Sequence, residues 1–167
     1  LLGTALARQG DYRNAAAEFQ ELLKSRPEDS NALSRLGDAY LHLGNTAKAE
    51  QSFNQAFKSN PENPEPLAKL AEIAVRQQNP AKALAMINQQ ISRFPKQPKL
   101  YELQGQVYAN QKDYAKAEQA FRKALSLDGN SLTAYANLAA LFKVQDSSDK
   151  AIRELENALK INPKSPQ

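Results

Sequence analysis

Histidine and carboxylate side chains are the groups of this sequence with the clearest capacity for acid–base chemistry. The only histidine is His42, and the chain has no cysteine. A single histidine without a thiol provides neither a cysteine–histidine nucleophilic pair nor a histidine metal cluster. Glu18 and Glu21 lie three residues apart, which on a helix places both on one solvated face. The glycines are scattered and form no phosphate-binding loop. The residues therefore predict a protein that is not an enzyme and that needs no metal or cofactor.

The charge balance indicates a solvated surface rather than a nucleic-acid site. The 167 residues include 22 lysines and arginines and 18 acidic residues, for a net charge of +4. Charges of both signs alternate along the chain, whereas nucleic-acid recognition requires a concentrated basic surface. No apolar run approaches the roughly 18 residues of a transmembrane helix. We expect no nucleic-acid partner and no direct insertion of this segment into a membrane.

A repeat of 34 residues organises the whole chain. Alanine recurs at this spacing in one column, a tiny residue in a second, a large apolar residue in a third, and proline in most of a fourth. No insertion or deletion interrupts the spacing. The columns are Ala15, Ala49, Ala83, Ala117 and Ala151; Gly3, Gly37, Ala71, Gly105 and Ala139; Phe19, Phe53, Ile87, Phe121 and Leu155; and Pro27, Pro61, Pro95, Gly129 and Pro163.

Each unit is predicted to form two helices joined by a short turn. Good N-cap residues precede every second helix and most first helices, and the proline column ends the second helices. The caps are Asp11, Asn45, Asn79, Asp113 and Ser147 for second helices, and Asp29, Asn63, Ser131 and the poorer Gln97 for first helices. The predicted pairs are 1–9 with 12–25, 30–43 with 46–59, 64–77 with 80–93, 98–111 with 114–127, and 132–145 with 148–161.

The small residues of the repeat predict where the two helices of a pair meet. Helices in a tight hairpin approach closely only where their facing side chains are small, as at Gly37 and Ala49. Leu36, Tyr40 and Phe53 are expected to fill the space around that contact. One pair cannot bury its apolar face alone, so neighbouring pairs must stack. The predicted fold class is all-α, an α-solenoid with a curved inner groove.

These residues resemble the tetratricopeptide repeat family over the whole chain. In the fourth unit the matching residues are Tyr101, Gly105, Tyr108, Ala117, Phe121 and Ala124. The resemblance implies a right-handed superhelix of antiparallel helix pairs whose first helices line a concave, peptide-binding groove. The inward residues that it implies are Arg8, Asn31, Ser34, Asp38, His42, Glu65, Lys69, Glu72, Arg76, Lys99, Glu102, Gln106 and Asn110, with Thr4 beside Arg8.

Some positions depart from the family pattern. The third unit is the loosest, with Ala74 in place of an aromatic residue and Gln90 in place of alanine, and Gln104 replaces an apolar residue. These departures indicate either drift in a tolerant array or a flexible joint or partner contact near Gln90 and Gln104.

The resemblance implies a non-catalytic scaffold that binds a protein or peptide segment. Mixed charges and amides suit an extended or helical peptide and would set its register. The family's chaperone-type carboxylate clamp is not matched, because the corresponding places carry Ser34, Asp38, Lys69, Lys99 and Leu103. Two alternatives stay open: a self-assembly module, and the non-catalytic arm of a larger enzyme or of a bacterial envelope or secretion complex.

We expect one array over residues 1–167, with repeats at about 1–29, 30–63, 64–97, 98–131 and 132–165. The first unit lacks the start of its first helix, and Ser165 and Pro166 repeat the start of a new one, which indicates a fragment of a longer array. Leu155 and Leu159 would then form an uncovered face, and its pairing with another copy in crystals or at high concentration would be an artefact of the cut. The gap-free array and its high content of glutamine and lysine favour a bacterial source. A location in the cytoplasm and one in the periplasm fit the sequence equally well.

Overall fold

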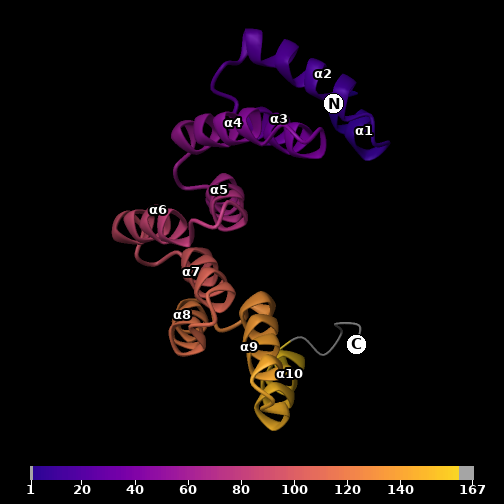
Figure 1. Cartoon of the computed structure of the whole chain (residues 1–167). Helices are drawn as coiled ribbons and strands as arrows, with labels where there is room; N and C mark the ends of the chain where they lie inside the picture. The colour runs from indigo at the N-terminus through magenta and orange to yellow at the C-terminus, as the bar shows by residue number, and fades with distance from the viewer. Residues whose placement is uncertain (1, 162–167) are drawn as a thin grey trace. The chain divides into compact units, whose positions relative to one another are not determined.

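The computed structural model describes residues 2–161, which form ten helices and no strand (Figure 1). The all-α prediction is confirmed. The first helices of the pairs are α1 (Leu2–Arg8), α3 (Ser30–His42), α5 (Pro64–Arg76), α7 (Pro98–Asn110) and α9 (Leu132–Val144). The second helices are α2 (Tyr12–Ser25), α4 (Thr46–Ser59), α6 (Pro80–Arg93), α8 (Tyr114–Leu127) and α10 (Ser148–Ile161). The predicted roles of Pro163, Ser165 and Pro166 fall outside the described residues.

The chain forms two compact units that divide between Gln78 and Asn79. The first unit contains α1 to α5 and the second contains α6 to α10, so the third repeat contributes one helix to each. Within each unit, helices that follow one another pack together. Each unit has its own apolar core: one includes Ala15, Phe19, Leu36 and Ala39, and the other includes Ala117, Phe121, Leu138, Leu141 and Phe142.

A residue in the left-handed conformation ends the first helix of every pair. The φ angles are 82° at Gly10, 73° at Gly44, 58° at Gln78, 63° at Lys112 and 54° at Asp146, and these positions are 34 residues apart. In the second pair, the Gly44 N–H donates to the Leu41 carbonyl oxygen at 3.0 Å, and the Asn45 N–H donates to the Tyr40 carbonyl oxygen at 2.8 Å. These are the two bonds of a Schellman C-cap. Because the cap takes up the last turn, each first helix ends one residue before its predicted end.

The residue after this turn also caps the second helix. The side chains of Asp11, Asn45, Asn79 and Asp113 each accept a hydrogen bond from the backbone N–H three residues later, as predicted. The Ser147 hydroxyl, which precedes α10, donates to the Gln145 carbonyl oxygen. Among the caps of first helices, Gln97 makes no side-chain capping bond to α7.

At Asp113 the ammonium group of Lys116 lies 2.7 Å from the carboxylate. This bond, and secondarily the backbone N–H of Lys116, lowers the pKa of the Asp113 carboxyl group.

The tiny residues on the first helices make room for a phenylalanine ring from the second helix of the same pair. A Cβ atom added to Gly37 would lie 2.7 Å from Phe53 Cε1, and one added to Gly105 would lie 2.5 Å from Phe121 Cε1. The same columns hold Ala139 with Leu155 in the fifth repeat, where the second helix supplies a smaller side chain. Ala49 is completely buried. At Gly37 the space left by the missing side chain is therefore taken up by the Phe53 ring.

One polar departure from the family pattern has a partner inside the second unit. The Gln104 amide on α7 donates to the Asn88 side-chain oxygen on α6 at 2.7 Å. Gln90, also on α6, is almost fully buried. Both glutamines therefore take part in packing between helices of this unit.

Candidate functional site

The first unit contains a hollow of about 330 Å³ between α1, α2 and α3, which Lys69 of α5 borders. We call it the first-unit hollow. Its polar and charged lining residues are Thr4, Arg8, Arg35, Asp38, His42 and Lys69, and its apolar and aromatic ones are Ala7, Tyr12, Phe19 and Ala39. Phe19 and Ala39 are buried, whereas Arg8, Arg35 and His42 are at least partly exposed. The hollow therefore has an apolar floor and a charged rim.

The repeat itself brings these residues together. The left-handed cap at Gly10 keeps the turn between α1 and α2 short. Only this turn separates Arg8 at the end of α1 from Tyr12 at the start of α2. Arg35, Asp38 and His42 are spaced by three and four residues on α3, which places them on one side of that helix.

Two contacts organise the rim of the first-unit hollow. The Lys69 ammonium group lies 3.2 Å from Asp38 Oδ1, which links α5 to α3, and both side chains are partly exposed. The His42 ring stacks on the Tyr12 ring with 4.0 Å between centroids and 3° between planes. An exposed ion pair of this kind adds little stability, so it leaves the lysine available to a ligand.

Both arginines of the rim are unpaired in the part of the chain that the structure describes. Within residues 2–161, neither Arg8 nor Arg35 makes an ion pair or a side-chain hydrogen bond. A guanidinium group presents several donors in a planar fork that matches a carboxylate. The rim of the first-unit hollow can therefore bind an anion without breaking an existing contact of either arginine.

Five of the inward residues predicted from the sequence line the first-unit hollow: Thr4, Arg8, Asp38, His42 and Lys69. The others in the first unit lie apart from it. Asn31 and Glu65 are exposed, and Glu72 forms an exposed ion pair with Arg76 at 2.6 Å.

Ser34 is 8% exposed. Its hydroxyl group is buried and has no hydrogen-bond partner among the described residues. Ser34 therefore offers a ligand very little surface.

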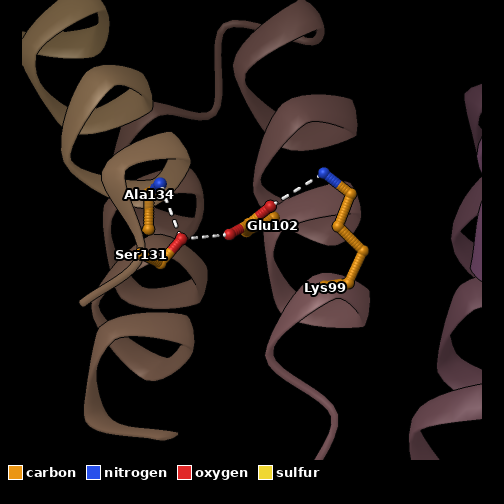
Figure 2. A network of polar contacts seen from close by, with 4 residues as sticks. All are labelled: Lys99, Glu102, Ser131 and Ala134. Carbon is orange, nitrogen blue, oxygen red and sulfur yellow. Dashed lines mark hydrogen bonds and ion pairs between the residues drawn. The ribbon is translucent and has the colours of Figure 1, made fainter. Parts of the chain in front are cut away.

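The predicted groove residues of the second unit divide into a buried network and an exposed pair. Glu102 is 4% exposed. One of its carboxylate oxygens accepts a bond from the Ser131 hydroxyl at 2.6 Å, and the other lies 2.9 Å from the Lys99 ammonium group (Figure 2). Ser131 also accepts the Ala134 N–H as the N-cap of α9. Glu102 therefore ties α7 to the start of α9, while Gln106 and Asn110 are exposed.

Sequence reasoning missed Arg35 and Tyr12 as residues of the site. Arg35 lies 34 residues before Lys69, so the repeat register alone placed the two in one column. Tyr12 had no comparable signal, because the stack with His42 joins residues 30 positions apart.

Two negative findings apply to the described part of the chain. No group of three or more histidine, cysteine or acidic side chains is arranged to hold a metal ion there. Among its helices, none is long and apolar enough to cross a membrane.

The helix pairs, their repeated caps and the ring-on-glycine packing define a helical-hairpin repeat protein. Tetratricopeptide repeat models match residues 1–64, 44–107 and 98–131. The chain belongs to the tetratricopeptide repeat family, whose members bind protein partners and are generally non-catalytic. It matches none of the curated proteins with which it was compared.

Solved structures of the same fold cover almost the whole chain. TTC0263, a thermophilic tetratricopeptide repeat protein of Thermus thermophilus, is 27% identical with a TM-score of 0.75, over 98% of this chain and 90% of that one. PilW, a type IV pilus biogenesis factor, is 22% identical with a TM-score of 0.75, over 99% and 76%. YrrB, a repeat protein with an unusual peptide-binding site, is 19% identical with a TM-score of 0.58, over 97% and 84%. These likenesses confirm the helical-repeat solenoid class.

Proposed function

We propose that this chain is a non-catalytic scaffold that binds a peptide or protein segment on the surface of its first helices. The observation that carries the proposal is the first-unit hollow. Five of the predicted inward residues line it, and its two arginines, which have no ion-pair partner among residues 2–161, are accessible at the rim. A shallow site with an apolar floor and a few convergent polar groups suits a side chain of a bound segment.

Affinity capture from lysate of the source cells tests this proposal. The wild-type chain is compared with the double variant Lys69→Glu and Arg76→Glu, which reverses two charges on α5. A matched control reverses two exposed charges on second helices, Arg13→Glu and Lys58→Glu. All four are surface changes, so we expect the three proteins to fold alike.

The captured proteins distinguish the alternatives. A protein other than this chain that is captured by the wild type and by the control, but not by the α5 double variant, supports the scaffold function. If all three baits capture the same proteins, the first-helix surface is not the binding site.

Self-assembly is the second candidate, and a specific observation favours it. Three aliphatic residues of α10 are substantially exposed: Ile152 at 53%, Leu155 at 49% and Leu159 at 41%. Large exposed apolar residues on one helix favour association with another surface. Sedimentation velocity over a range of concentrations should detect a dimer, and Leu155→Glu should abolish it. A chain that stays monomeric at every concentration would exclude this candidate.

A further inference from the structure

The charges around the first-unit hollow are unbalanced. Arg8, Arg35 and Lys69 contribute three positive charges, and Asp38 is the only carboxylate among the lining residues. The Lys69 ammonium group already forms an ion pair with Asp38, with 3.2 Å between Nζ and Oδ1. The two arginines have no ion-pair partner among residues 2–161. A ligand that complements this rim is therefore negatively charged.

The size and floor of the first-unit hollow restrict the ligand further. Its volume of about 330 Å³ lies at the lower end of the roughly 300–1,000 Å³ of ligand sites. The floor contains buried Phe19 and Ala39, and the stacked Tyr12 and His42 rings form an aromatic wall. An apolar or aromatic side chain fits such a floor, while the unpaired arginines lie at its rim.

We infer that the first-unit hollow binds an acidic peptide segment in which a bulky apolar side chain is flanked by aspartate or glutamate. The apolar side chain enters the hollow, and the neighbouring carboxylates bind Arg8 and Arg35. Bidentate bonds from a guanidinium group to a carboxylate supply both affinity and orientation. This inference rests on the proposed scaffold function and specifies the chemistry of its partner.

Nucleic acid fits the same surface less well. A polyanion needs a basic stripe that follows its backbone, whereas the basic rim here is interrupted by Asp38 and followed on α5 by Glu65 and Glu72. A short acidic segment requires only the local excess of charge.

Fluorescence anisotropy with labelled synthetic peptides tests the inference on the full 167-residue chain. The probe has a central phenylalanine flanked by glutamates in a glycine–serine background. One matched peptide has glutamines in place of the glutamates, another has lysines, and a third keeps the glutamates around a central alanine. A labelled single-stranded oligonucleotide is the polyanion control.

Three protein variants accompany the wild type. Arg8→Gln with Arg35→Gln removes both free guanidinium groups, and Arg13→Gln with Lys58→Gln removes two exposed positive charges outside the hollow. Asp38→Asn removes the one carboxylate of the hollow at constant shape. Circular dichroism checks that all variants are folded.

We expect the glutamate peptide to bind at least about tenfold more tightly than the glutamine peptide, as charge-assisted bonds imply. The double arginine variant should lose this preference, the control variant should keep it, and the central alanine should weaken binding. Asp38→Asn should tighten binding of the glutamate peptide about two- to fivefold, because a like charge is removed. This opposite sign separates a charge effect from damage to the fold.

Several results would overturn the inference. Equal affinity for glutamate and glutamine peptides, or no effect of the double arginine variant, excludes recognition of acidic side chains here. Tighter binding of the oligonucleotide through the same arginines would identify nucleic acid as the ligand. A dissociation constant of the glutamate peptide above about 1 mM also overturns the inference. The scaffold function is tested separately, by the capture experiment. A further outcome is that wild-type protein instead binds the glutamine or lysine peptide and that Lys69→Glu with Arg76→Glu abolishes this binding. Such a result would support the scaffold function and exclude an acidic ligand.

Discussion

Gly105→Ala should destabilise the second unit, although alanine is the better helix former. The added Cβ atom would lie 2.5 Å from Phe121 Cε1 and 2.6 Å from Phe121 Cδ1. Carbon atoms in favourable contact are about 3.5–4.0 Å apart. Phe121 is buried in a core cluster with Leu138 and Phe142, so its ring has little room to withdraw.

Two opposing contributions determine the expected magnitude. Replacing glycine by alanine inside a helix stabilises it by about 0.8–1.0 kcal/mol. Overpacking of a well-packed core costs about 1–3 kcal/mol. The difference is about 0–2 kcal/mol. Because the overlap at Gly105 is severe, the net cost there should lie in the upper half of this range, at about 1–2 kcal/mol. At Gly3 the nearest ring atom would be 3.0 Å away, so Gly3→Ala should be close to neutral.

Urea unfolding followed by far-UV circular dichroism measures the change, and amide hydrogen exchange locates it on α7 and α8. A double-mutant cycle with Phe121→Leu isolates the contact. The fifth repeat already combines Ala139 with Leu155, so alanine at position 105 should be tolerated once the ring is gone. The coupling energy should be about 1–3 kcal/mol.

Two outcomes would refute this reasoning. Equal effects of Gly105→Ala and Gly3→Ala would show that ring distance does not control the cost. A Gly105→Ala penalty unchanged by Phe121→Leu would show that the ring is not its cause.

Substitutions at three further positions test other parts of the fold by urea or thermal unfolding. Ala49→Leu adds bulk at a fully buried position and should cost about 1–3 kcal/mol; an unchanged melting temperature would contradict the packing. Lys112→Gly should stabilise by about 0.5–1 kcal/mol, because Lys112 has a φ of 63° that glycine adopts without the strain of a side chain; a loss of stability would contradict this. Glu102→Ala should cost about 1.5–3 kcal/mol through the lost bonds to Ser131 and Lys99, and Glu102→Gln less; equal costs would show that the carboxylate charge is unimportant.

Most of the fold could be predicted from the sequence because its determinants are local or periodic. Capping residues act within three positions, as Asn45 does on the Lys48 N–H. The 34-residue register repeats the same choices five times, so the ends of every described second helix were predicted to the residue. The one-residue difference at the first helices comes from the left-handed cap, which Gln78, Lys112 and Asp146 adopt without being glycine.

The candidate site was predicted only in part. The register placed five residues on first helices that the structure brings to one hollow: Thr4, Arg8, Asp38, His42 and Lys69. The same register also predicted that Glu102 would face a ligand. In the structure Glu102 is instead buried, and its carboxylate ties α7 to the start of α9. A periodic pattern identifies a helix face but does not show what a neighbouring helix contributes to it.

The repeat, the helix pairs and the family could all be inferred without a structure, because caps, turns and a constant period are properties of neighbouring residues. The packing of the helices was needed to show that a phenylalanine ring rests on Gly37 and Gly105 and that Tyr12 stacks on His42. It also showed that the two arginines of the rim have no ion-pair partner among residues 2–161. These features join residues from different helices, and their formation depends on the side chains available at each crossing. The same 34-residue pattern therefore produces a charged hollow in the first unit and a buried carboxylate in the second.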